Sequence, residues 1–273
     1  MSGPEVLKGA TWFETNWPFM SSFFFPIALV VPFLPFFFSR PSIKSAFLDA
    51  LRSPYVLGWL TVPFYLIHQT EEHAYDLRGW RYAFVPNFNH GVGALLFDCE
   101  KQGHLRCPLE PRITLEVNVG CVWIGFVVCM ICAHYLRGPY AYAGICNWGM
   151  CIVNSLGGHL LPWLLMGYNP GDDIMWMRHR AFQSLFQVAF GIYVLATCPG
   201  TCRFAAVAIF DGILFHAIVF GIGTSISIKL GWPTEVTGLL SIIFTTAFPL
   251  RLASCFAPRS EYDKMKDSDE ESA

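Results

Sequence analysis

Residues 113–136 read ITLEVNVGCVWIGFVVCMICAHYL, and this stretch decides the fold. Among its 24 residues, Glu116 is the one side chain with a formal charge when histidine is neutral. A helix needs about 20 mostly apolar residues to cross the hydrocarbon core of a bilayer. The stretch is therefore predicted to be a membrane-spanning α-helix.

Similar apolar segments lie on both sides of this one. Together they predict an all-α protein, a polytopic membrane helical bundle with about seven transmembrane helices. The predicted spans are Phe19–Phe38, Tyr55–Glu72, Ile113–Leu136, Tyr140–Met166, Phe182–Thr197, Phe204–Ile228 and Thr237–Phe256. Because the fifth span is short, a count of six stays open. The first segment has no basic stretch before it and no small-residue cleavage site, so it is interpreted as a span rather than a signal peptide.

Composition agrees with a membrane protein. Hydrophobic residues make up 54% of the chain and charged residues 14%, whereas an ordinary soluble domain is about a quarter charged. The net charge is −2 and no basic block occurs, so nucleic acid is excluded as a predicted partner. The predicted partners are the lipid bilayer and a lipophilic small-molecule substrate.

The chain is predicted to form one transmembrane domain over residues 1–257. Within it, residues 73–112 form a long aromatic-rich loop, which is predicted to lie at the membrane interface. Residues 258–273 are polar and acidic and are predicted to be disordered. Alternating spans place nine Lys and Arg residues on each face of the membrane, so orientation and compartment stay open.

The predicted spans carry an unusual set of ionisable residues at their ends and in their interiors. Ionisable groups inside a bilayer are costly and indicate function. They are Glu71, Glu72, Glu116, Asp211, His68, His159 and His216. No Lys or Arg lies in the interior of a span. The acids are therefore either protonated or neutralised by a cation from outside the chain, of which a metal ion is the simplest.

Spacing supports a metal ion. Glu71 and Glu72 follow His68 at positions i+3 and i+4, so the three residues share one face of a helix. His159 and His216 lie on spans that run back toward the same face of the membrane. Imidazole and carboxylate groups from facing helices are the ligands that bundles offer to zinc or iron. The predicted ligands of a divalent metal are therefore His68, Glu72, His159 and His216.

Each of these residues also has a simpler interpretation. In that interpretation His68 to Glu72 is an ordinary interfacial helix end, and His159 is a core histidine bonded to a carbonyl. Asp211 and His216 then make two separate interhelical hydrogen bonds, and Glu116 favours a helix N-terminus. Two amides have structural roles in this interpretation, Asn118 as interhelical glue and Asn154 as glue or as support for a ligand.

Three short blocks of sequence carry a family resemblance. They read HQTEE at 68–72, NSLGGH at 154–159 and YNPG at 168–171. The first block, at the end of a predicted span, matches the pattern after which the HXXEE-domain integral membrane proteins are named, and the other two resemble later blocks of that family. The resemblance implies a multi-span helical fold and no particular activity.

The leading functional prediction is a membrane-embedded metal-dependent hydrolase that cleaves an ester or amide in a lipophilic substrate. A bound metal ion would activate water, and Glu71 or Glu72 would act as the general base. A metal-free alternative is an acid-catalysed lipid or terpenoid isomerase or cyclase, in which Glu72 and Asp211 donate protons. A third alternative is a non-enzymatic transporter or structural protein. Conduction of protons by acidic residues would favour it, but no internal repeat supports it.

Overall fold

A computed structural model of the chain describes residues 10–39, 42–74, 110–161, 164, 181–197 and 202–257. Every regular element in these ranges is helical. The interfacial loop predicted at 73–112 falls mostly outside the described residues, as do the acidic tail predicted at 258–273 and the YNPG block.

The elements follow one another as short helical segments that often continue into each other. They are α1 (Trp12–Val30), η1 (Val31–Phe33), α2 (Leu34–Ser39), α3 (Ile43–Ala50), α4 (Pro54–Trp59), α5 (Thr61–His73), α9 (Pro111–Asn118), η3 (Val119–Phe126), α10 (Val127–Leu136), η4 (Gly138–Tyr142), α11 (Ala143–Val153), η5 (Asn154–Leu160), α13 (Ala181–Thr197), α14 (Cys202–Phe215), η7 (His216–Gly223), α15 (Thr224–Lys229), α16 (Glu235–Thr245) and α17 (Ala247–Phe256).

Four continuous helices in the described residues are long and apolar enough to cross a membrane. They cover Trp12–Phe38, Pro111–Leu136, Arg203–Lys229 and Glu235–Phe256. The helical class and membrane-length helices are thus confirmed, whereas the count of about seven is not. The predicted second span forms α4 and α5, which meet at Leu60. Residues 68–73 are mostly polar and lower the hydropathy of this pair, and α13 is shorter than a full span.

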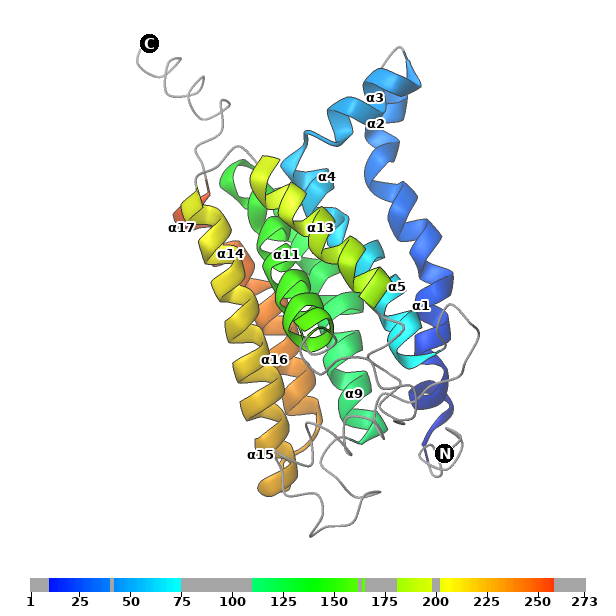
Figure 1. Ribbon diagram of the computed structural model, residues 1–273, viewed down its shortest axis with the longest axis vertical. Coiled ribbons are helices and arrows are strands. Elements are labelled where there is room, and N and C mark those ends of the chain that lie inside the picture. The colour runs from blue at the N-terminus through cyan, green and yellow to red at the C-terminus, as the bar shows by residue number, and fades with distance from the viewer. Residues whose placement is uncertain are drawn as a thin grey trace.

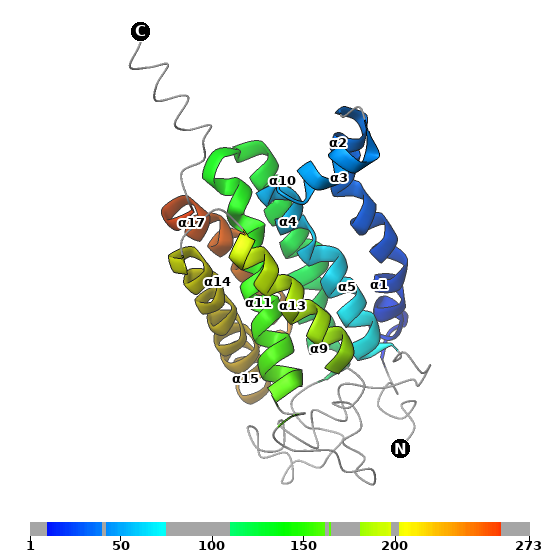
Figure 2. The ribbon, with the colours of Figure 1, turned by 45° about the horizontal axis from the view of Figure 1, so that its top comes forward.

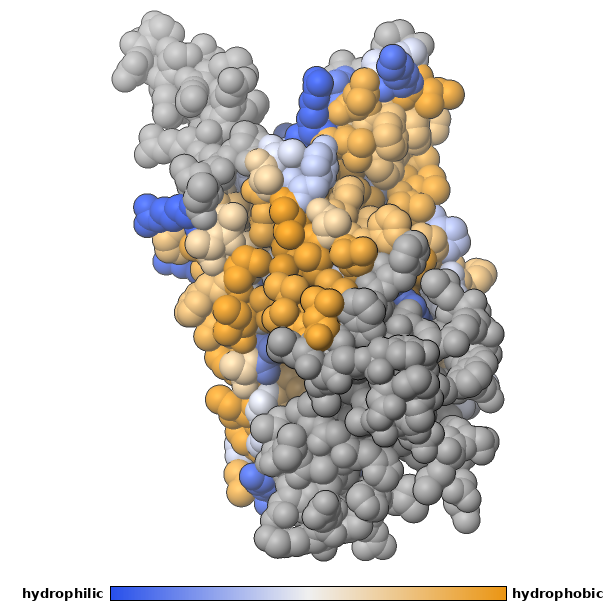
Figure 3. Space-filling view, viewed as in Figure 1, coloured by the Kyte–Doolittle hydropathy of each residue, from blue (hydrophilic) through white to orange (hydrophobic). Residues whose placement is uncertain are grey.

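The surface agrees with insertion into a bilayer. Figure 3 shows apolar side chains over the visible middle of the helices, with hydrophilic side chains near α3 and near α17. Large apolar residues such as Phe23, Ile213 and Leu239 are more than half exposed. Aqueous solvent would disfavour so much exposed apolar surface, whereas lipid tails accommodate it.

Helix α11 forms the centre of the bundle. It lies between α14 and α5, with α1 at the outer edge (Figures 1 and 2), and it packs against α4, α13 and α17 as well. Its contact with α14 depends on glycine, because a Cβ atom on Gly149 would lie 1.7 Å from the carbonyl oxygen of Ala208. Small residues let membrane helices approach closely in this way.

Polar contacts join α5 to α1 and η3. The Gln69 side chain is completely buried, and its Oε1 accepts hydrogen bonds from Ser21 Oγ at 3.1 Å and Trp123 Nε1 at 3.2 Å. Its Nε2 donates to the backbone oxygen of Asn118 at 3.0 Å and to the Asn118 side chain at 3.3 Å. We call this arrangement the Gln69 clamp. Its donors and acceptors are matched, and it fixes the end of α5 in the bundle. Asn118 therefore has the structural role of the simpler interpretation.

Three spans contain π-helical segments, namely η3, η5 and η7. A π-helical turn carries an extra residue relative to an α-helical turn, and such turns are frequent at functional sites. Two of the three contain a predicted metal ligand, since His159 lies in η5 and His216 begins η7. The wider turn rotates the residues that follow it relative to a regular α-helix.

Candidate metal site

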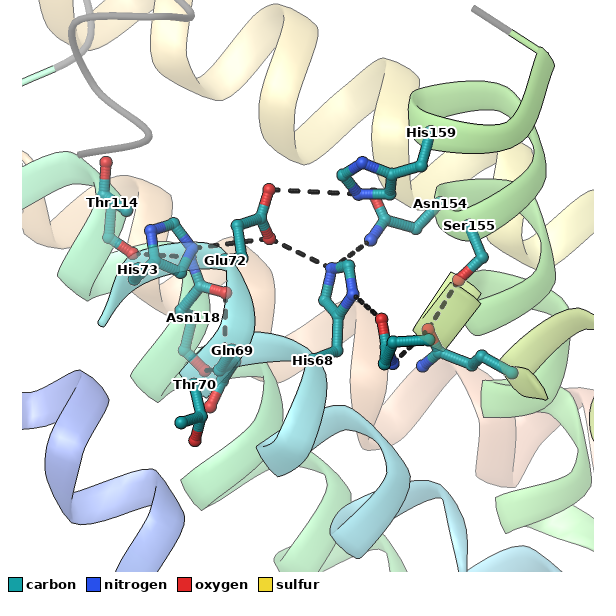
Figure 4. Close-up of polar contacts among 12 residues, drawn as sticks. His68, Gln69, Thr70, Glu72, His73, Thr114, Asn118, Asn154, Ser155 and His159 are labelled. Carbon is teal, nitrogen blue, oxygen red and sulfur yellow. Dashed lines mark hydrogen bonds and ion pairs between the residues drawn. The ribbon is translucent and has the colours of Figure 1, made fainter. Parts of the chain in front are cut away.

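The last turns of α5 carry the first two site residues. His68 and Glu72 are one turn apart and both buried, and His68 Nε2 lies 3.0 Å from Glu72 Oε2. The predicted sharing of one helix face therefore holds for this pair. Figure 4 shows both side chains pointing away from α1 and toward η5.

The third residue comes from η5, on the neighbouring span. His159 is buried, its Nε2 lies 3.9 Å from Glu72 Oε1, and its ring meets the His68 ring edge-on at 5.0 Å between centroids. One ligand atom from each of His68, Glu72 and His159 lies within 4.8 Å of the others. Glu72 and His159 are far apart in the sequence, so the packing of the helices brings this group together.

A third imidazole lies beside the same carboxylate. His73 Nε2 lies 3.4 Å from Glu72 Oε2, and its ring packs on Trp17 with 5.0 Å between the centroids. The sequence assigns His73 to the start of the long loop, whereas α5 includes it. The sequence did contain a signal for His73 as a site residue, because it directly follows the HQTEE block.

Two amides orient His68 from opposite sides of its ring. The ring Nδ1 lies 2.9 Å from Gln183 Oε1, and the ring Nε2 lies 2.9 Å from Asn154 Nδ2. An amide oxygen only accepts, so Nδ1 carries the proton and Nε2 presents a lone pair. Metal-binding histidines commonly donate their second ring N–H to an oxygen in this way. Gln183 is a site residue that the sequence did not single out, whereas Asn154 contacts the ring nitrogen that a metal ion would use.

The polar face of α13 continues behind Gln183. Gln183 Nε2 donates to Gln187 Oε1 at 3.5 Å, and Ser155 Oγ donates to the same oxygen. This chain of contacts begins beside the His68 ring, because Gln183 Oε1 lies 2.9 Å from His68 Nδ1. It connects α13 to both α5 and η5, the two segments that carry the ligand atoms. The spacing of Gln183 and Gln187, one helical turn apart in an apolar helix, was the available sequence signal.

The remaining predicted site residues lie outside the group of three. His216 Nδ1 donates to the carbonyl oxygen of Gly212 at 2.7 Å, within its own helix. Glu116 lies near the start of the third span, where Arg112 Nε is 3.9 Å from its carboxylate. Glu71 and Asp211 are buried, but neither belongs to the group. The structure thus brings together three of the four predicted ligands.

The distances within this group are near those between the ligands of one metal ion. In a tetrahedral zinc site with bonds of about 2.1 Å, neighbouring ligand atoms are about 3.4 Å apart. His68 Nε2 lies 3.0 Å from Glu72 Oε2 and His159 Nε2 lies 3.9 Å from Glu72 Oε1, so the two histidines approach different oxygens of the carboxylate at distances on either side of this value. A proton or a metal ion between His68 Nε2 and Glu72 Oε2, which are 3.0 Å apart, would join the two groups.

Comparison of the chain with family models, with curated proteins and with solved structures found no match. The resemblance to the HXXEE-domain proteins therefore stays a prediction.

Proposed function

We propose that the protein is a multi-pass membrane enzyme that uses one divalent metal ion, zinc or iron, to hydrolyse an ester or amide in a lipophilic substrate. The observation that supports this most is the group formed by His68, Glu72 and His159, whose ligand atoms lie within 4.8 Å of one another. The membership in the HXXEE-domain proteins that the HQTEE block suggests is part of the same proposal.

The donor set favours a catalytic rather than a purely structural site. Structural zinc sites use four protein ligands, whereas catalytic sites use three and leave one position for water or substrate. Two imidazoles and one carboxylate are the ligands of a known class of zinc hydrolase site, and they suit iron as well. A bound zinc ion lowers the pKa of its water to about 7, which supplies a nucleophile at neutral pH.

The residues around the three ligands have distinct roles in this proposal. Gln183 would hold the proton on His68 Nδ1, and Nε2, which Asn154 Nδ2 contacts in the structure, would become the ligand atom when a metal ion binds. His73, 3.4 Å from Glu72, accepts a proton from the attacking water and returns it to the leaving group. Glu71, the preceding buried acid, is the alternative base that the sequence indicates.

The surroundings of the site favour a lipophilic substrate. The three ligands are buried, and the neighbouring helices α13 and α14 expose large apolar side chains such as Phe186, Phe210 and Ile213. A substrate that dissolves in the bilayer can approach between such helices. A polar substrate would lose its hydration on the same route.

A metal-free enzyme is the second candidate, and the 3.0 Å contact between His68 and Glu72 favours it. A histidine and a carboxylate at this distance share a proton, so the pair can act as an acid and base toward a lipid or terpenoid double bond. This is the isomerase or cyclase alternative with Glu72 as the acid.

Metal analysis of the detergent-purified full chain separates the two candidates. The wild type is expected to carry about one zinc or iron ion per chain, and His68→Ala and Glu72→Gln are expected to lose it. His134→Ala is the matched control, because His134 is exposed at the end of α10. A wild-type protein that binds no metal after incubation with zinc or iron would rule out the metal enzyme and favour the acid–base candidate.

Activity is tested with a long-chain acyl ester or amide that releases a chromophore in detergent micelles. Hydrolysis is expected to stop after chelation and to return when zinc or iron is added. Equal activity before and after complete removal of the metal would contradict the proposal.

A further inference from the structure

The side chain of Asn154 lies directly beside the candidate metal site. Asn154 begins η5, the segment that carries His159, and its Nδ2 lies 2.9 Å from His68 Nε2 on α5. The same ring nitrogen lies 3.0 Å from Glu72 Oε2. Figure 4 shows the Asn154 amide among the polar atoms of His68, Glu72 and His159. A side-chain amide is therefore the fourth polar group at this point in the bundle.

The π-helical form of η5 explains how Asn154 and His159 reach the same place. Residues five apart are separated by about 140° around an α-helix, so they lie on different faces. The hydrogen bonds of a π-helix instead run between residues five apart, which brings such residues close to one face. Because η5 is π-helical over Asn154–Leu160, its wider turn presents the amide and the imidazole to the site together.

The contact between Asn154 and His68 suits the protein without a metal ion. His68 donates from Nδ1 to Gln183, so its Nε2 accepts a hydrogen bond from Asn154 Nδ2. A metal ion on Nε2 would use the same lone pair, so metal binding and this hydrogen bond exclude each other. Rotation of the amide by half a turn about its last bond replaces Nδ2 with Oδ1, an oxygen that offers lone pairs.

The surroundings of Asn154 permit this rotation. Within the described ranges, the one hydrogen bond of the Asn154 side chain is its contact with His68, so the rotation breaks no other. On the opposite side of the amide, Oδ1 faces Gly158, where even an added Cβ atom would lie 3.4 Å away. Glycine at this position therefore leaves room for Nδ2 after the exchange.

We propose that Asn154 is a fourth protein ligand of the divalent metal ion and binds it through Oδ1. The inference rests on the proposed metal site of His68, Glu72 and His159. Two ligand atoms at right angles, with bonds of about 2.1 Å, are about 3.0 Å apart. The distances from His68 Nε2 to Glu72 Oε2 and to the Asn154 amide, 3.0 Å and 2.9 Å, match this spacing. A fifth position stays open for water, as catalytic zinc sites and iron sites allow.

Two other roles for Asn154 predict different results. If the amide only caps the lone pair of His68 Nε2, it competes with the metal ion, and its removal strengthens metal binding. If the amide only fills space, a side chain of the same shape leaves metal binding unchanged. A ligand is the one role of the three for which loss of the oxygen weakens metal binding.

The test measures zinc affinity of the detergent-purified full chain by competition with a chromophoric chelator. Asn154→Leu keeps the shape of the side chain without its oxygen, and it is expected to lower the affinity by about 10-fold or more. Asn154→Asp restores an oxygen and is expected to bind zinc at least as tightly as the wild type. Asn16→Ala is the control with unchanged affinity, because Asn16 bonds to the backbone of its own helix at Trp12.

The direction of each change decides the outcome. Tighter binding by Asn154→Leu would show that Asn154 competes with the ion, and equal binding would show that it is no ligand. Weaker binding by both Asn154→Leu and Asn154→Asp would assign it a packing role. If Asn154→Leu does not fold, Asn154→Ala takes its place with the same expected loss. A wild type that binds no zinc or iron would instead overturn the proposed function itself, so the two failures are distinguishable.

Discussion

Two adjacent faces of α5 bury polar side chains in different surroundings. On one face Gln69 forms the Gln69 clamp, in which both amide atoms have partners on α1 and η3. On the other face Glu72 meets the rings of His68, His73 and His159. Both side chains are buried to a similar degree, at 0% and 6% exposed. The comparison teaches that burial alone does not distinguish the two groups, whereas their neighbours do, because Gln69 lies among hydrogen-bonding partners and Glu72 lies among imidazole rings.

The largest expected effect comes from removing a ligand. His159→Ala deletes one of three ligand atoms, so metal affinity is expected to fall by more than about 100-fold, beyond the loss typical for residues that only support a ligand. Competition with a chromophoric chelator measures this loss. Unchanged affinity would show that the two faces do not differ as proposed.

The next effect tests the clamp. Gln69→Leu leaves the donors of Trp123 and Ser21 and the acceptors of Asn118 without their buried partner. The free energy of unfolding is expected to fall by about 2 kcal/mol, while the metal content per folded chain stays the same. Denaturant unfolding and metal analysis on one sample check both parts. Loss of metal without loss of stability would contradict the division into two faces.

Gln183, which lies on α13, allows a further test of the comparison. Gln183→Leu removes the oxygen that accepts from His68 Nδ1, so metal affinity is expected to fall by about 10-fold. Gln183→Glu is the matched control and is expected to retain affinity, because its carboxylate accepts the same hydrogen bond. If both variants bind metal equally weakly, the role of Gln183 is packing rather than orientation of His68.

The smallest effect is expected at the exposed start of the third span. Arg112 contacts Glu235 and lies near Glu116, and both Arg112 and Glu235 are at least half exposed. Exposed ion pairs contribute little to stability. Arg112→Gln is therefore expected to leave both metal affinity and melting temperature unchanged. A change in metal affinity would show that Glu116 takes part in the site after all.

The sequence predicted particular parts of the candidate site and missed others. His68 and Glu72 could be found because they are close in sequence on one helix, and their spacing alone puts them on one face. His159 could be found because a histidine in an apolar span is rare. Gln183 and His73 were not found, because neutral amides are common helix glue and His73 stands where the apolar segment ends. His216 was predicted as a ligand and lies outside the group of three, although it is within electrostatic range of Glu72 and its Nδ1 bond to Gly212 leaves Nε2 available. Its role as a ligand stays a prediction.

The count of spans shows a similar limit. The stretch 113–136 is apolar over a bilayer's thickness, and it forms a continuous helix of sufficient length. The second predicted span is divided at Leu60 and ends in the polar site residues, so its apolar length falls short. A hydropathy pattern does not show where a helix breaks, so the sequence did not predict the division at Leu60.

By itself, the sequence determined that the chain is helical, that it carries helices able to cross a bilayer, and that acids and histidines lie among them. These are properties of single segments, since apolar length and residue spacing act along one helix. Only the tertiary structure decided that His159 joins His68 and Glu72 in one group while His216 lies outside it, and that Gln69 is fully paired. Those outcomes depend on how helices rotate and approach one another, which small residues such as Gly149 and the π-helical turn of η5 control.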